Sequence, residues 1–302
     1  MTGKLTLSIL AAATLTFGAA AKEVKLLTIG NSFADSAFKF LPKVAESAGD
    51  KVIMDRANIG GCPLDKHWKL VEKSEQDPAV KPYYRKNTLR DKLGAQKWDF
   101  VTIQQASHLS WKPESYMPYA KNLQEYVKKY APQAELVIQQ TWAYRFDDNR
   151  LKSWKMSQRE MFDKLVDAYD QAAAGLGIRL IPTGEAVQLA RETQPVKYVE
   201  YDREALKSLK YPDPLPSEAG SFAVGMSWGS RKNKATGENE RYIYNDPAHL
   251  NDRGRYLQAC VWYGFFFDKP TSEIKFVPEG ITEEDAAFLR ATAQKVLDAR
   301  KK

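Results

Sequence analysis

Residues 24–33 read VKLLTIGNSF, a short apolar run that ends in a glycine and two small polar residues. A run of this length, with valine, threonine and isoleucine in it, predicts a buried strand. Residues 34–48 follow with apolar side chains at steps of three and four, which predicts a helix. The stretch therefore predicts a strand, a tight turn and a helix, which is the repeating unit of a parallel sheet.

The same alternation continues along the chain. Strands are predicted at residues 24–29, 52–57, 100–104, 136–140 and 179–182. Helices are predicted at residues 34–48, 64–74, 115–130, 158–176, 253–267 and 283–301. Because crossover helices cover both faces of a parallel sheet, we predict an α/β fold, a three-layer α/β/α sandwich with a five-stranded parallel sheet.

Residues 194–244 do not follow this alternation. They mix Pro212, Pro214 and Pro216 with glycines, charges and aromatic residues and show no lasting periodicity. We expect a long insertion loop within a single domain that spans residues 22–302. Loops of that length in compact domains are often functional.

Composition limits the class of protein. The chain has 302 residues, of which 43% are hydrophobic and 27% charged, so disordered, collagen-like and multi-span membrane proteins are excluded. Lys and Arg number 45 against 38 Asp and Glu, and the resulting net charge of +7 suits an acidic substrate or surface. Acidic and basic residues are interleaved and no nucleic-acid motif is present, so we expect no nucleic-acid partner.

The N-terminus has the pattern of a secretory signal peptide. Lys4 precedes an apolar stretch at residues 5–17, and three alanines at 19–21 offer a cleavage site after Ala21. The apolar stretch is too short to span a bilayer, and no other stretch reaches the ~20 apolar residues that a transmembrane helix needs. We therefore expect a signal peptide at residues 1–21 and a mature protein that is exported, either periplasmic or secreted, without a membrane span.

Three histidines and two cysteines are scattered along the chain without the spacing of a zinc site, so we expect no metal and no cofactor. Export would permit a disulfide between Cys62 and Cys260, but nothing in the sequence places them together, and the pairing stays open. The acidic pair Asp147 and Asp148 is expected in a loop as solvated charge.

Ser32 follows the first predicted strand, at the edge of the sheet where open parallel sheets bind ligands. A serine on such a turn exposes its hydroxyl near a helix N-terminus, which favours a developing anion. It is therefore a candidate nucleophile. The alternative is that Ser32 or Asn31 only caps the helix that follows.

Residues 246–249 read DPAH, and a predicted helix begins a few residues later. The spacing lets Asp246 hold the imidazole of His249 in one tautomer and leave the other ring nitrogen free as a base. The alternative is a turn residue and a half-buried histidine with no role in chemistry.

Together, GNSF at residues 30–33 and DPAH at residues 246–249 resemble the first and last blocks of the SGNH, or GDSL-type, hydrolase superfamily. The two blocks bracket almost the whole mature chain. The resemblance implies a flavodoxin-like fold and serine hydrolase chemistry: Ser32 would be the nucleophile, His249 the general base and then acid, and Asp246 the group that orients His249. The chain resembles a group of exported bacterial SGNH-type proteins with GNSF, QQxS and DxxH motifs.

The same resemblance implies an oxyanion hole. The backbone N–H groups of Ser32 and Gly61 would contribute to it, although the glycine pair that contains Gly61 is also compatible with a simple turn. The superfamily takes its third donor from an Asn in a G-x-N-D block, where this chain reads QQASH at residues 104–108. Gln105 has the same amide chemistry and is favoured as the donor. Counting from the strand start points to His108 instead.

Further candidates are weaker. Asn31, His108 and Trp142 are candidate substrate-binding residues, and Trp142 with Tyr144 forms either an aromatic platform at the pocket rim or part of the core. His67 is expected to be structural.

Residues and resemblance together predict a cofactor-free serine esterase. Export, a basic surface and aromatic loop residues agree with removal of acetyl groups from an extracellular or cell-wall polysaccharide, so an acylated small molecule or polysaccharide is the expected partner. Two alternatives stay open: a carbohydrate O-acyltransferase on the same fold, and a non-catalytic carbohydrate-binding protein.

Overall fold

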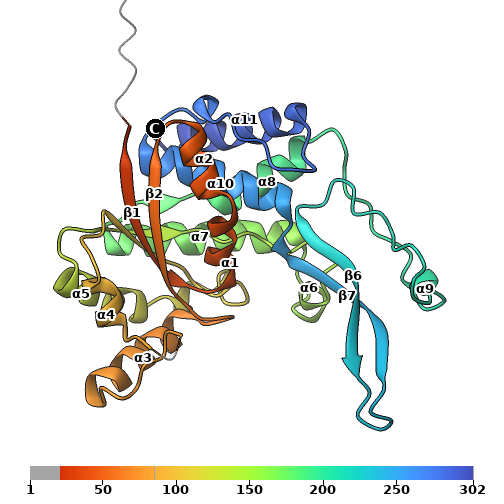
Figure 1. Ribbon diagram of the computed structural model, residues 1–302, viewed down its shortest axis with the longest axis horizontal. Helices are drawn as coiled ribbons and strands as arrows, with labels where there is room; N and C mark the ends of the chain where they lie inside the picture. The colour runs from red at the N-terminus through yellow and green to blue at the C-terminus, as the bar shows by residue number, and fades with distance from the viewer. Residues whose placement is uncertain (1–20, 85, 302) are drawn as a thin grey trace, which may run out of the picture.

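The computed structural model describes residues 21–84 and 86–301 and contains a five-stranded parallel sheet (Figure 1). The strand order is β2-β1-β3-β4-β5, the flavodoxin-like order. All five predicted strands are present, with each end within one residue of its predicted position. The strands are β1 (Glu23–Gly30), β2 (Lys51–Asn58), β3 (Phe100–Ile103), β4 (Glu135–Gln139) and β5 (Leu180–Ile181).

Helices cover both faces of the sheet and complete the three predicted layers (Figure 1). One face carries α2 (Leu41–Ser47), α8 (Thr183–Thr193) and α10 (Asp252–Phe267), with α11 (Glu283–Arg300) packed on α10. The other carries α3 (Leu64–Gln76), α4 (Leu89–Gly94), α5 (Tyr119–Tyr130) and α7 (Gln158–Leu176). Of these, α4 and α8 were not predicted.

Helix ends follow local capping chemistry. Helix α7 has the predicted bounds because Ser157 and Glu160 form a capping box at its start and Gly177 ends it with a φ of 64°. Residues 34–48 were predicted as one helix but are broken into α1 (Ser32–Asp35), a 3₁₀ turn (Ser36–Lys39) and α2. Pro42 explains the break, since proline fits only the first turn of a helix.

The segment predicted as a long loop at residues 194–244 contains regular structure. It includes the short helix α9 (Arg203–Leu206) and an antiparallel ribbon of β6 (Ala223–Lys232) and β7 (Asn239–Leu250), which extends away from the sandwich (Figure 1). The prediction of a loop was wrong because both faces of the outer ribbon are largely exposed, so no alternation of apolar and polar residues marks it.

The predicted signal peptide lies, apart from Ala21, outside the described residues. None of the described helices combines the length and the apolar character that crossing a membrane requires. Cys62 and Cys260 are both buried free thiols, so the structure forms no disulfide between them.

Candidate active site

Ser32 lies on the turn between β1 and α1, at the point where strand order reverses between β1 and β3. The preceding Asn31 is buried and fixes this turn. Its Oδ1 accepts the backbone N–H of Phe33 at 3.1 Å and Nε2 of Gln104 at 2.7 Å, and its Nδ2 donates to the carbonyl of Cys62 at 3.1 Å. Asn31 therefore caps the helix, which leaves the Ser32 hydroxyl for another partner.

The segment that carries Asp246 and His249 is the inner end of β7. Oδ1 of Asp246 accepts the backbone N–H groups of Ala248 at 3.1 Å and His249 at 2.9 Å, which curls the chain around the carboxylate. The indole of Trp142 donates to the Ala248 carbonyl at 2.7 Å and stacks on the Phe33 ring at 4.2 Å. Trp142 thus joins the histidine turn to the serine turn.

These two turns bring Ser32, His249 and Asp246 together. The Ser32 Oγ lies 2.7 Å from His249 Nε2, and His249 Nδ1 lies 2.7 Å from Asp246 Oδ2. Burial acts to raise the pKa of the Asp246 carboxyl, but the hydrogen bonds from the ring and backbone of His249 outweigh it and hold that pKa well below its usual range. Asp246 is therefore ionised at neutral pH and faces the Nδ1–H of His249.

A cavity of about 270 Å³ opens beside this trio. The residues that line it come from both ends of the chain and from the loops after β2, β3 and β4: Asn31, Ser32, Phe33, Gly61, Ala106, Ser107, His108, Tyr144, Arg150, Tyr244, Asn245, Asp246, Pro247, Ala248 and His249.

Gly61 lies at the edge of this cavity with a φ of 62°, a backbone conformation that favours glycine. Among the described residues, no backbone carbonyl accepts its N–H. The backbone N–H of Gly61 is therefore not taken by another backbone group.

Gln105, the favoured side-chain donor, does not reach the cavity. Its Oε1 accepts the backbone N–H groups of Leu64 at 3.1 Å and Ala106 at 2.8 Å, and its Nε2 donates to the carbonyl and hydroxyl of Ser115. The amide is fully buried and occupied. The assignment to the oxyanion hole was wrong, because the side chain ties the loop after β3 to neighbouring segments instead. His108, the other candidate, lines the cavity.

Trp142 and Asn31 were predicted as substrate-binding residues, but their positions do not fit that role. Trp142 is completely buried and lies in the core below the cavity, not at its rim. Asn31 uses three of its four hydrogen-bonding positions on the protein itself. Both residues hold the turns of the site rather than offer free surface to a ligand.

Arg150, which was not predicted, lines the cavity from α6 (Asn149–Ser153). The prediction of Asp147 and Asp148 as solvated charge was wrong, since both are buried and paired with Arg145 and Arg150. An Asp followed two residues later by an Arg, at the start of a short helix, was the available signal.

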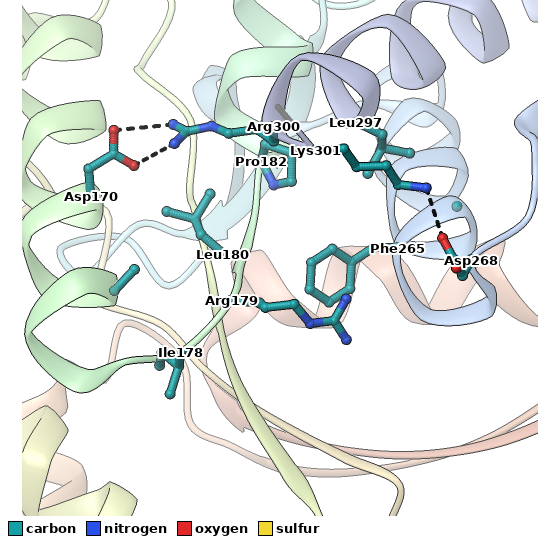
Figure 2. Close-up of a pocket in the computed structure, with 12 residues that line it drawn as sticks. Asp170, Ile178, Arg179, Leu180, Pro182, Phe265, Asp268, Leu297, Arg300 and Lys301 are labelled. Carbon is teal, nitrogen blue, oxygen red and sulfur yellow. Dashed lines mark hydrogen bonds and ion pairs between the residues drawn. The ribbon is translucent and has the colours of Figure 1, made fainter.

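A larger cavity of about 440 Å³ lies at the β5 edge, between α7, α10 and α11 (Figure 2). Its charged residues are paired: Arg300 binds Asp170, Lys301 binds Asp268, and Arg179 binds Glu135 beyond the lining. Neither Ser, His nor Cys is among its lining residues. Within the described part of the chain, no three His, Cys, Asp or Glu residues are grouped as metal ligands would be.

Comparisons with known proteins support the fold. A search of curated proteins found no match. A protein of the DUF4886 family from Bacteroides uniformis, whose structure is solved, is 26% identical; the alignment covers 93% of this chain and 96% of that one, with a TM-score of 0.69. A protein from Slackia heliotrinireducens, provisionally described as an SGNH hydrolase, is 22% identical over 80% of this chain and 97% of its own, with a TM-score of 0.49.

A family model described as a domain of unknown function, DUF4886, matches residues 25–211, which contain Ser32, most of β1, the other four strands of the sheet and the loops after them. The match spans more than half of the chain, and the chain belongs to the DUF4886 family.

Proposed function

We propose that the protein is a serine esterase that removes small acyl groups, acetyl above all, from an extracellular or cell-wall carbohydrate. The observation that carries the proposal is the continuous relay from the Ser32 hydroxyl through both ring nitrogens of His249 to the Asp246 carboxylate. A serine hydroxyl is a weak nucleophile at neutral pH and needs an oriented base of this kind.

The reaction runs in two halves. Ser32 Oγ attacks the ester carbonyl while His249 Nε2 accepts its proton, and Asp246 stabilises the imidazolium that forms. The tetrahedral intermediate expels the sugar hydroxyl, which takes the proton from His249 and leaves an acyl group on Ser32. Water then attacks this acyl-enzyme with His249 again as the base, and the acid leaves as Ser32 regains its proton.

The backbone N–H groups of Ser32 and Gly61 would stabilise the oxyanion in both halves. With the Gln105 amide held by Ser115, we assign the third donor to His108, which lies on the loop after β3 and lines the same cavity. The pKa of His108 is lowered, chiefly by burial and then by the nearby charges of Arg150 and Lys112. A neutral imidazole keeps one N–H with which to donate.

The size and lining of the cavity favour a small acyl group. A volume of about 270 Å³ lies just below the usual range for drug-sized ligands, and polar side chains and backbone make up much of its wall. A long fatty acyl chain would need an apolar channel that these residues do not provide. The predicted export and the basic surface fit a polysaccharide outside the cell as the carrier of the ester.

Release of acid from p-nitrophenyl acetate and from acetylated polysaccharides tests the proposal, with wild type compared with Ser32→Ala. We expect Ser32→Ala to lose activity by three orders of magnitude or more and to lose labelling by a fluorophosphonate probe. Ser208→Ala changes an exposed serine on a distant loop and serves as the matched control.

Product that forms only when a sugar acceptor is added would indicate an acyltransferase. No turnover and no labelling of the wild type would indicate a binding protein, and either result would refute the esterase.

A further inference from the structure

Arg150 is a cationic side chain that the proposed reaction does not use. It lines the same cavity as Ser32 and His249, and its side chain is 44% exposed. Asp246, the acidic residue in that lining, turns its two oxygens toward the ring and backbone of His249. The charge of Arg150 is thus open to a ligand at the mouth of the site.

The guanidinium is held in one orientation. Its Nε and Nη2 donate to the two carboxylate oxygens of Asp148 at 2.9 and 2.6 Å, and Asp148 itself is almost fully buried. The guanidinium carbon lies 3.8 Å from the ring centre of Tyr144, whose hydroxyl bonds to Ser107 Oγ at 2.8 Å. A group fixed from two sides loses little conformational entropy when it binds a ligand.

One edge of the guanidinium stays open. Of its five N–H groups, two are taken by Asp148, and no acceptor among the described residues bonds to Nη1. Three N–H groups remain, and one on Nη1 lies parallel to the one on Nη2 at the end of the side chain. That spacing matches the two oxygens of a carboxylate, which planar guanidinium groups bind through paired hydrogen bonds.

The surroundings favour an anion, although Asp148 offsets part of the charge. Besides its burial, the positive charges of Arg150 and Lys112 act to lower the pKa of His108, and Asp65 opposes them with a smaller effect. At His108 the charges of Arg150 and Lys112 thus outweigh that of Asp65, while the carboxylates of Asp148 and Asp246 act on Arg150 itself. A neutral hydroxyl would satisfy the open N–H groups but would not use the charge of the guanidinium.

We infer that Arg150 binds a carboxylate of the substrate, so that the preferred ester is an acylated sugar acid rather than an acylated neutral sugar. This inference rests on the proposed esterase function and names its substrate class. Arg150 is then a specificity-determining residue: it binds the sugar acid beside the ester, while Ser32 and His249 carry out the chemistry.

The test compares two substrates that differ by one group. Equilibrated mono-O-acetyl mixtures of methyl glucuronoside and methyl 6-deoxyglucoside carry the ester on the same three ring hydroxyls and differ in a carboxylate in place of CH₃, and acetate release gives an apparent kcat/KM for each. We expect wild type to prefer the glucuronoside by about tenfold or more, since a hydrogen bond to a charged group is typically that strong. Arg150→Gln should bring this ratio close to one, and Arg150→Lys should retain part of it.

Arg159→Gln removes an exposed arginine on α7 and should leave the ratio as in wild type. Circular dichroism and thermal melting show whether each variant is folded. A wild-type ratio near one, or a ratio in folded Arg150→Gln equal to that of wild type, would overturn the inference while leaving the esterase intact.

If neither ester is turned over, the proposed function fails, and binding then decides the inference. Calorimetry with Ser32→Ala should show the acetylated glucuronoside binding at least tenfold more tightly than the acetylated 6-deoxyglucoside, a difference that Arg150→Gln removes. Equal affinities would refute a carboxylate site at Arg150.

Discussion

The cavity beside Ser32 has a volume of about 270 Å³ and the cavity at the β5 edge about 440 Å³, yet the smaller one holds the groups that can carry out a reaction. In the larger cavity, Arg300, Lys301 and Arg179 each bind an acidic partner, and the aromatic and aliphatic lining offers no nucleophile. In the smaller cavity, hydrogen bonds link the hydroxyl of Ser32, the imidazole of His249 and the carboxylate of Asp246. The guanidinium of Arg150 keeps one edge free of protein acceptors.

Ion pairs that satisfy one another stabilise the junction of helices but leave little with which to bind a ligand. A site needs groups whose partners are arranged so that one side stays unsatisfied. The protein provides this at the carboxyl ends of the parallel strands, where Asn31 after β1 and Trp142 after β4 donate to backbone carbonyls and leave Ser32 and His249 free to face each other. The contrast predicts that substitutions in the two cavities differ in kind.

Asp246→Asn should have the largest effect, a loss of about 10⁴-fold in kcat on p-nitrophenyl acetate. Oδ1 accepts two backbone N–H groups, so the amide oxygen of Asn would take that position and its NH₂ would point at His249 Nδ1. The ring would then carry its proton on Nε2 and could not accept one from Ser32. Steady-state kinetics measures the loss.

Asp298→Asn, on the exposed face of α11, is the matched control and should keep wild-type rates. Asp246→Asn activity within tenfold of wild type, in a folded variant, would show that the carboxylate does not set the tautomer and would remove the main distinction between the two cavities.

His108→Ala should come second, with a loss of about 10² to 10³-fold in kcat, the usual result of removing one oxyanion donor. His108→Asn keeps a side-chain N–H and should recover much of that loss. The comparison of kcat with KM separates a donor from a binding residue, since a donor acts on kcat. A His108→Ala enzyme within twofold of wild type would leave the oxyanion to the backbone N–H groups alone.

The sheet was predictable because its strands are short and buried, so their apolar runs are uninterrupted and glycine, proline or polar residues end them. The ribbon of β6 and β7 was not, since most of its side chains face solvent and its pairing depends on hydrogen bonds that leave no sequence pattern. Helix α8 begins right after Pro182 and was not predicted from its apolar residues.

The residues alone predicted Ser32 at the ligand-binding edge of the sheet and Asp246 within reach of His249; that the two groups meet was implied by the resemblance to the SGNH superfamily. The direction of Gln105 could not be predicted, since it is set by Leu64 and Ser115 on other segments. Arg150 was missed for the same reason: its place in the cavity depends on stacking against Tyr144 and on a buried Asp148.

Arg300→Gln, in the larger cavity, should have the smallest effect. Arg300 pairs with Asp170 of α7 and Glu185 of α8, and its removal should lower the free energy of unfolding by about 1 kcal/mol, as is usual for partly exposed pairs. Part of that loss comes from Glu185. Burial already raises the pKa of this carboxyl, and its charge would lose its main partner. Urea denaturation measures the change, and kcat/KM on p-nitrophenyl acetate should stay within twofold of wild type. A tenfold fall in kcat/KM with unchanged stability would mean that the larger cavity takes part in the reaction, because a group that only joins helices can alter turnover only by altering the fold.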